Sequence, residues 1–403
     1  MSMIQLKDIC TKIGSGATPT GGKSAYLSQG ISLIRSQNVL DYTFTMDGLA
    51  YINEDQAMKL NNVEVQKGDI LLNITGDSVA RVCIVPNNVL PARVNQHVAI
   101  IRVDEDKADN NYVLYSLIKS KKSLLSLAGG GATRNALTKK MIEEFEIELP
   151  QLSIQKKIAA QLSEIDDKIA VNRRICENLE AQAQALFKHW FIDFAPFKIG
   201  KFVESELGMI PEGWRVGRLG DVADITMGQS PAGSSYNEKG EGIFFYQGRT
   251  EFGFRYPSVR LYTTEPKRFA EPLSTLLSVR APVGDINVAT DKCCIGRGLA
   301  SIKSNNNCHS YIFYLLQSMK RRFDVYNGEG TVFGSINKDT LNGLKIIIPS
   351  NSILLGFEEI VEEMDKKILG CHQENLRLSA LRDTLLPKLM SGQIKVNEVE
   401  KSL

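Results

Sequence analysis

The chain has 403 residues, of which 43% are hydrophobic and 23% are charged; these proportions are ordinary for a globular protein of two or three domains and exclude a disordered chain. No run of about eighteen apolar residues predicts a membrane span, and the first residues do not resemble a secretory signal, so we expect a cytoplasmic protein. The formal net charge of +2 neither favours nor excludes a polyanionic partner, because phosphate binding depends on local basic clusters.

The front part of the chain, residues 1–151, has the pattern of a mixed α+β globule. Short β-branched runs, such as those at 69–74 and 98–103, lie between glycine, asparagine and proline clusters, as strands do. One amphipathic helix interrupts them, and we expect it to begin after Asn111 as its cap.

The next segment, residues 152–191, predicts one long helix. Its apolar positions alternate spacings of four and three, which is the seam of a coiled coil. The seam residues are Ile158, Leu162, Ile165, Ile169, Asn172, Cys176, Leu179, Ala183, Leu186 and Trp190. A helix of this length would extend roughly 58 Å at about 1.5 Å per residue, so we interpret it as a spacer and not as a core helix.

The second half of the chain repeats the first at an offset of 199 residues. Tyr112 and Tyr115 align with Tyr311 and Tyr314, and the alignment continues without a gap to the end of the long helix. The second front part therefore predicts a second globule over 214–350, whose helix begins after Ser310. A second seam follows in 351–391, at Phe357, Val361, Met364, Ile368, Cys371, Asn375, Leu378, Arg382, Leu385 and Leu389.

A single heptad seam would indicate homodimerisation, or a helix packed along a globule. Two matched seams in one chain favour an intramolecular antiparallel coiled coil, because the linker gives each helix a high effective concentration of the other. Such a pair would hold the two globules at opposite ends of a rod. The polar seam residues Asn172 and Asn375 are candidates for setting the register. If they face each other, Ile158 meets Leu389 and Trp190 meets Phe357.

Four segments in order resemble those of type I restriction-modification specificity subunits. They are LFKHWFIDFAPFK from Leu186, GMIPEGWRVGRLGDV from Gly208, GRGLASIK from Gly296 and LPKLMSGQIKV from Leu386. Together with the order of domains and helices, the resemblance covers essentially the whole chain. It implies target-recognition domains at 1–151 and 214–350, spacer helices at 152–191 and 351–391, a linker at 192–213 and a tail at 392–403.

The resemblance also implies the function and the partners. Each domain would read one half of a split double-stranded DNA site, and the paired helices would act as ruler and docking surface. Two methyltransferase subunits, which carry S-adenosylmethionine and methylate adenine, would bind the helices, and restriction subunits would add to that core. The first repeat lacks the proline and tryptophan that open the second, and it has Gln96 and His97 where the second has Arg297 and Gly298. We therefore expect different half-sites and a non-palindromic target.

Catalytic motifs are missing from the sequence. No Asn-Pro-Pro-Tyr or Asp-Pro-Pro-Tyr stretch, as adenine methyltransferases present to a flipped base, occurs in the chain. The seven cysteines form no CxxC pair, and the four histidines lack metal-ligand spacing. We therefore expect a non-enzymatic subunit with no metal and no cofactor of its own.

Loops rich in arginine, asparagine and glutamine are the candidates for base reading, because arginine or lysine pairs with guanine, and asparagine or glutamine with adenine. In the first domain these DNA-binding candidates are Arg35, Gln37, Asn38, Arg81, Arg93, Asn95, Gln96, Arg134 and Asn135. In the second domain they are Gln247, Arg249, Arg280 and Arg297, with Lys320, Arg321 and Arg322 as a phosphate clamp. Any of these residues could instead belong to a solvated turn, and the three basic residues to the charged end of a helix.

Two rival functions remain at this point. One is a fused enzyme that both reads and methylates DNA, which a methylation assay on the isolated chain would reveal. The other is a coiled-coil scaffold whose globules bind protein. Salt dependence separates the scaffold from a DNA reader, because phosphate-driven binding weakens steeply as salt rises.

Overall fold

The computed structural model describes residues 2–129, 135–327 and 334–394. The chain divides into two compact units: unit 1 holds residues 1–172 and 373–403, and unit 2 holds residues 173–372. Each unit contains one mixed α/β domain and a portion of both long helices. We therefore describe each unit by itself.

Unit 1 is built on two small sheets. The first has the order β2-β9-β6-β7 and is antiparallel; its strands are Cys10–Ser15, Val98–Val103, Ile70–Asn73 and Val82–Ile84. The second has the order β4-β3-β8-β5, with β3 and β8 parallel; its strands are Ala50–Ile52, Ile31–Ile34, Ala92–Val94 and Glu64–Val65. A separate antiparallel pair joins β1 (Ser2–Gln5) to β10 (Glu146–Leu149).

The central strands of unit 1 are buried on both faces, which is why they are continuous apolar runs. On β6, Ile70 and Leu72 contribute to one core, while Leu71 points into the core that the second sheet shares. The first of these cores also includes residues of the helices. The helices of the unit 1 domain are α1 (Leu6–Ile9), α2 (Glu54–Lys59), α3 (Asn110–Lys119), α4 (Lys121–Gly129) and α5 (Lys139–Glu143).

Unit 2 repeats this plan. Its first sheet has the order β14-β22-β19-β20, with strands Ala223–Met227, Leu299–Ser304, Thr275–Ser278 and Ile286–Val288. Its second has the order β15-β17-β16-β21-β18, with strands Tyr236–Asn237, Leu261–Thr263, Ile243–Tyr246, Cys293–Ile295 and Phe269–Ala270. The parallel pair is now β16 and β21, the counterparts of β3 and β8. The separate pair is β13 (Arg215–Arg218) with β23 (Lys345–Ile348), and the helices are α7 (His309–Ser318), α8 (Lys320–Asp324) and α9 (Lys338–Asn342).

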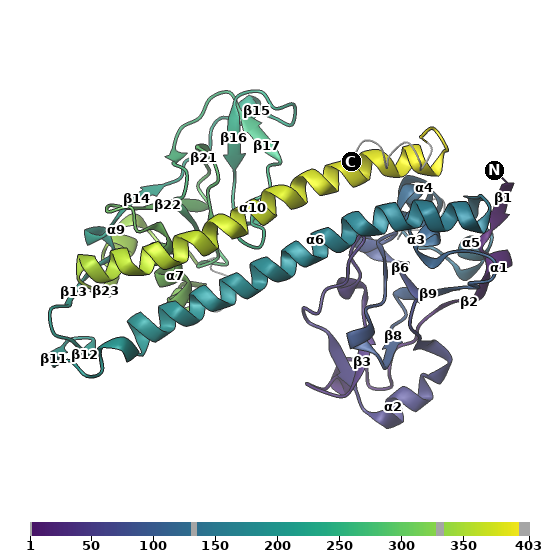
Figure 1. Cartoon of the computed structure of the whole chain (residues 1–403), viewed down its shortest axis with the longest axis horizontal. Coiled ribbons are helices and arrows are strands. Elements are labelled where there is room, and N and C mark those ends of the chain that lie inside the picture. The colour runs from purple at the N-terminus through teal and green to yellow at the C-terminus, as the bar shows by residue number, and fades with distance from the viewer. Residues whose placement is uncertain (1, 130–134, 328–333, 395–403) are drawn as a thin grey trace. The chain divides into compact units, whose positions relative to one another are not determined.

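The two long helices are α6 (Leu152–Phe187), which continues into a π-helical turn at Lys188–Ile192, and α10 (Asn351–Met390) (Figure 1). In unit 1, Ile158 and Leu389 belong to one apolar cluster. In unit 2, the rings of Trp190 and Phe357 have centroids 6.0 Å apart. Unit 1 also has a hydrogen bond from Asn172 to Asn375, and in unit 2 the Cys176 thiol donates to the Ile368 carbonyl at 3.7 Å. Within each unit, facing residue numbers therefore rise along α6 as they fall along α10, so the two helices are antiparallel there. A knobs-into-holes supercoil stays a prediction.

Two local features differ from the sequence-based expectation. The segment 192–213, expected as a linker, contains a hairpin of β11 (Phe202–Ser205) and β12 (Gly208–Pro211). The predicted helix caps were also wrong. The N-cap of α3 is Asp109 and not Asn111, and its carboxylate accepts a hydrogen bond from the Tyr112 amide at 2.9 Å. The first turn of α7 is satisfied instead by Glu358 of α10, which accepts from the Ser310 amide at 2.9 Å.

Candidate nucleic-acid interface

Three connections of the unit 2 domain meet beside the end of its first sheet. They carry Gln247 and Arg249 (after β16), Arg280 (between β19 and β20) and Arg297 (between β21 and β22), all exposed. The Val279 amide donates to the Gly298 carbonyl at 2.9 Å, and a Cβ on Gly298 would lie 3.0 Å from the Gln247 carbonyl oxygen. Glycine allows this close approach, so the structure brings the four candidate readers of unit 2 together.

The basic run at Lys320–Arg322 is divided between two places. Lys320 pairs with Asp285, which also holds Arg249 at 3.0 Å, and so Lys320 belongs to the same loop cluster. Arg322 instead donates to the Lys345 carbonyl at 2.9 Å, on β23, and Arg321 is exposed. Partly exposed ion pairs contribute only about 0–1 kcal/mol, so a DNA phosphate could replace Asp285 as the partner of Arg249 and Lys320.

In unit 1, the matching connection after β3 carries Arg35, Gln37 and Asn38. Asn38 is 0% exposed and braces the loop internally, because its amide donates to the Thr45 and Asp47 carbonyls at 3.1 and 3.2 Å. Gln37 is exposed and Arg35 half-buried, and both donate to the Gly48 carbonyl. We therefore retain Arg35 and Gln37 as candidate readers and regard Asn38 as the residue that shapes their loop.

Arg93 and Asn95 are buried and bonded within unit 1. Arg93 donates to the Ala57 carbonyl at 3.1 Å and pairs with Glu64 at 3.3 Å. The Asn95 side chain accepts from the His97 amide at 3.1 Å. These contacts give both residues structural roles and leave them poorly placed to reach a base edge.

The remaining candidates of unit 1 lie on loops near the end of β6. Gln96 is exposed and its amide lies 3.0 Å from His97 Nε2, while the His97 carbonyl accepts from the Ile74 amide at 3.0 Å. Asn135 is exposed and its carbonyl accepts from the Gly76 amide at 3.2 Å. Arg81 is half-buried on the β6–β7 connection. Arg134 lies outside the described residues.

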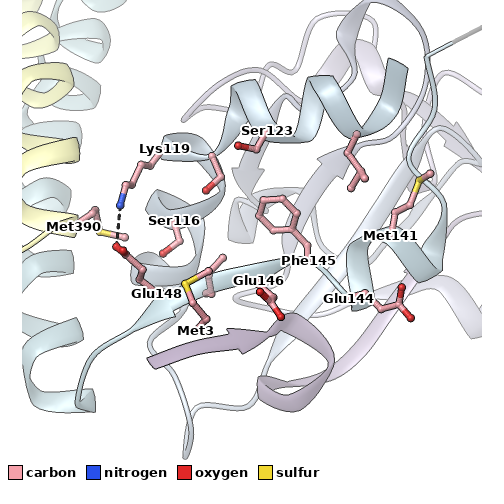
Figure 2. Close-up of a pocket in the computed structure, with 13 residues that line it drawn as sticks. Met3, Ser116, Lys119, Ser123, Met141, Glu144, Phe145, Glu146, Glu148 and Met390 are labelled. Atoms are coloured by element: carbon pink, nitrogen blue, oxygen red, sulfur yellow. Dashed lines mark hydrogen bonds and ion pairs between the residues drawn. The ribbon is translucent and has the colours of Figure 1, made fainter. Parts of the chain in front are cut away.

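A hollow of about 680 Å³ in unit 1 lies on different elements, near β1, β10 and the helices α3 to α5 (Figure 2). Met3, Met141 and Phe145 line it, together with the Lys119–Glu148 ion pair at 3.1 Å. Ser116 donates its hydroxyl to the Tyr112 carbonyl at 2.9 Å, and Lys119 is paired with Glu148, so both polar groups make structural contacts.

The buried thiols are suited to packing and not to chemistry. Burial raises the pKa of Cys83 and Cys293 to about 12, and that of Cys308 to about 11, so these side chains stay protonated and weakly nucleophilic. Within the part of the chain that the structure describes, no group of three or more His, Cys, Asp or Glu side chains could hold a metal ion. Among the same described residues, no helix is both long and apolar enough to cross a membrane.

Two further pairs of polar side chains lie at the long helices: the seam asparagines and two buried arginines. Asn172 donates to the Asn375 side chain at 2.9 Å, within unit 1. Arg255 and Arg382 are buried where each domain contacts its helices, and sequence reasoning did not select them for function. Arg382 could have been noticed in the sequence, because a charged residue is unusual at a seam position. Nothing in the sequence pointed to Arg255, because its partners Glu180 and Asp365 are distant along the chain.

Comparisons with known proteins agree with this architecture. The family of the type I restriction modification DNA specificity domain matches residues 1–181 and 211–375. A putative type I restriction enzyme MjaX specificity subunit of Methanocaldococcus jannaschii is 32% identical, over 97% of this chain and 93% of that protein. The MjaIX specificity subunit of the same organism is 30% identical, over 98% and 94%.

The fold has a counterpart among solved structures. A crystal structure of a type I restriction-modification S subunit from M. genitalium aligns with a TM-score of 0.58 at 15% identity, over 96% of this chain and 95% of that one. The paired family matches and the full-length relatives settle the classification: the chain belongs to the specificity subunits of type I restriction-modification systems, the DNA-recognition component and not the catalytic one.

Proposed function

We propose that each unit reads one half of a bipartite, non-palindromic DNA site. The observation that supports this most is the convergence of Gln247, Arg249, Arg280 and Arg297 from three connections of unit 2. Arginine and glutamine are side chains that bond base edges in the major groove. The matching connections of unit 1 carry arginine and glutamine in the opposite order, at Arg35 and Gln37, and Gln96 stands where unit 2 has Arg297, which favours two unlike half-sites.

The helix pair serves as spacer and docking surface in this proposal. Large apolar side chains are exposed on it, Val171 and Leu376 in unit 1 and Leu355 and Ile360 in unit 2. Exposed apolar groups on a helix surface are suited to protein contacts. We assign this surface to two methyltransferase subunits, which bring S-adenosylmethionine and methylate adenine in the cytoplasm. Restriction subunits would join the same core.

The test is methylation by the complex of this chain with its methyltransferase subunit. Sequencing of methylated adenines should give a split, non-palindromic motif. Arg297→Ala should relax one half of that motif, with a loss of discrimination of about tenfold, because a bidentate contact is worth about 1–3 kcal/mol. Arg218→Ala is the matched control, an exposed arginine of the same domain on β13, and should leave the motif unchanged.

The alternatives give different outcomes. Methylation by the isolated chain would indicate a fused enzyme. The scaffold alternative predicts no motif, and binding that changes little between low and high salt. Relaxation of both halves by Arg297→Ala would contradict the assignment of one half-site to each unit.

A further inference from the structure

A guanidinium is buried where the recognition domain of unit 2 contacts its helices. Arg255, 3% exposed, lies in the connection between β16 and β17. Its two terminal nitrogens lie 2.6 Å from Glu180 Oε2 on α6 and 2.8 Å from Asp365 Oδ1 on α10. The group stacks 3.5 Å from the ring centre of Phe313. One side chain of the domain therefore contacts both long helices.

Unit 1 has an equivalent site with a guanidinium from a different element. Asp166 and Tyr115 stand 199 residues before Asp365 and Tyr314, and the Tyr115 hydroxyl donates to Asp166 at 2.7 Å. The guanidinium here comes from Arg382 on α10, 2.6 Å from Asp166 and 3.4 Å from the ring centre of Tyr42. Tyr42 lies in the β3–β4 connection, the counterpart of the connection that carries Arg255.

The same connection begins with the candidate reading residues. In unit 2 it starts at Gln247 and Arg249, and hydrogen bonds hold it from there to Arg255. The Glu251 carboxylate accepts from the Gly248 amide at 3.1 Å, and the Asn287 side chain bonds both polar groups of the Gly253 backbone at 3.0 and 3.1 Å. The Val288 amide then donates to the Arg255 carbonyl at 2.9 Å. These hydrogen bonds tie the buried end of the connection to the end that carries the candidate reading residues.

A buried ion pair of this kind contributes more to the orientation of its partners than to the stability of the fold. Burial of charges costs free energy, and replacement of all members of such an ion pair by well-packed apolar side chains often gives equal or greater stability, whereas loss of one member is strongly destabilising. Burial also raises the pKa of Asp365, although Arg255 opposes the rise. What arginine adds is a planar, bidentate fork that fixes the orientation of its partners. Two units that place a guanidinium on equivalent aspartates from different elements indicate that the orientation itself matters.

We propose that Arg255 and Arg382 are positioning residues for DNA recognition: each holds the reading connection of its own unit in a fixed orientation on the helix pair. This inference rests on the proposed function. Each arginine then controls the fidelity of one half-site and not of the other.

The experiment uses the complex with the methyltransferase subunit and sequencing of methylated adenines. The wild-type complex is measured first, and absence of a split motif would refute the proposed function itself. Given that motif, Arg255→Met should lower discrimination in the half-site of unit 2 by about tenfold, comparable with loss of one base contact. Arg382→Met should do the same for the half-site of unit 1 alone. An unchanged motif in both variants would overturn the inference while leaving the proposed function intact.

Loss of stability alone must be distinguished from loss of position. Both tryptophans of the chain, Trp190 and Trp214, lie in unit 2, so their fluorescence follows the unfolding of that unit. Val361→Ala, a cavity variant at a fully buried seam position, is the matched control. If it lowers the melting temperature as Arg255→Met does and relaxes the motif equally, the role of Arg255 is merely structural.

Relocation of the guanidinium gives a second test. Ala183 stands 199 residues before Arg382, so it is the position in unit 2 that matches the arginine of unit 1. Arg255→Ala combined with Ala183→Arg should restore fidelity at the half-site of unit 2 above the level of Arg255→Ala alone. A double variant that folds, as judged by tryptophan fluorescence, and shows no recovery would contradict the inference.

Discussion

The seam asparagines offer a prediction whose magnitude follows from the structure. Asn172 is 1% exposed and donates to Asn375 at 2.9 Å and to Glu374 at 2.8 Å. Its own side-chain oxygen is buried without a hydrogen-bond partner among the described residues. Replacing both asparagines with leucine removes a neutral hydrogen bond worth about 1 kcal/mol and a bond to the Glu374 carboxylate worth about 2 kcal/mol. It also relieves an unsatisfied oxygen that costs about 2 kcal/mol, and leucine burial at position 172 adds about 2 kcal/mol. The double variant should therefore be more stable by about 1 kcal/mol.

Hydrogen exchange of the helix pair measures this change. A gain of about 1 kcal/mol slows exchange through helix opening by about fivefold, which mass spectrometry of peptides covering 160–175 and 370–380 would detect. Asn178→Leu is the matched control, because Asn178 is exposed on the same helix. Unchanged or faster exchange in the double variant would refute the reasoning from the unsatisfied oxygen.

A second readout on the same variant tests the register. Nitroxide labels at Val171 and Leu376, both exposed and both in unit 1, should give one narrow distance distribution in the wild-type chain. A polar seam residue can set register at a cost in stability, so the distribution should broaden in the double-leucine variant. An equally narrow distribution would show that the asparagines do not set the register.

Three further predictions concern single residues. Phe187→Ala should lower the free energy of unfolding by about 3–5 kcal/mol, because the side chain of Phe187 is buried, with 3% exposed. Urea unfolding followed by tryptophan fluorescence measures this loss. A loss below about 1 kcal/mol would argue against tight packing around Phe187. Burial raises the pKa of Glu358 above its ordinary 4.5, despite hydrogen bonds from Ser310 and Tyr311. A raised folded-state pKa gives stability that is present below the unfolded value and is lost as pH rises through the folded value. The melting temperature of Glu358→Gln relative to wild type should therefore increase from about pH 4 to about pH 7, and a flat difference would contradict this. Asn38→Ala should weaken binding to the half-site of unit 1 alone, as measured by fluorescence anisotropy with DNA altered in either half.

The sequence predicts the elements that depend on periodicity and repetition. The offset of 199 residues gives the doubled domain, and the alternation of four and three gives the two long helices, because these signals extend over many residues. We expected the first helix over 152–191; the structure has α6 at Leu152–Phe187 followed by a π-helical turn. Short elements such as the β11–β12 hairpin are missed, since two strands of four residues carry little pattern.

The candidate site was less predictable because burial of a polar side chain depends on distant partners. Arg93 looks like a base reader in sequence, yet its guanidinium is held by Ala57 and Asn61, which are more than thirty residues away. The Asn38 side chain likewise donates its hydrogen bonds within the turn that it shapes, to the Thr45 and Asp47 carbonyls. Arg297 is exposed in a turn between two glycines, as expected from the sequence, and its role in base reading stays a prediction.

Each unit has a buried ion-pair site, which we call its anchor: Arg382 with Asp166 in unit 1, and Arg255 with Glu180 and Asp365 in unit 2. The anchors have a consequence for how this gene could recombine. The anchor of unit 1 takes Arg382 from the second repeat, and the anchor of unit 2 takes Glu180 from the first. A foreign domain spliced in at its junction with a helix would meet Ala183 and an unpaired Asp365 unless it carried its own arginine. A replaced first domain would still meet Arg382, because this arginine lies on α10, after the second domain in the chain. Exchange of the first domain should therefore be tolerated more often than exchange of the second, whose own connection must supply the arginine at position 255.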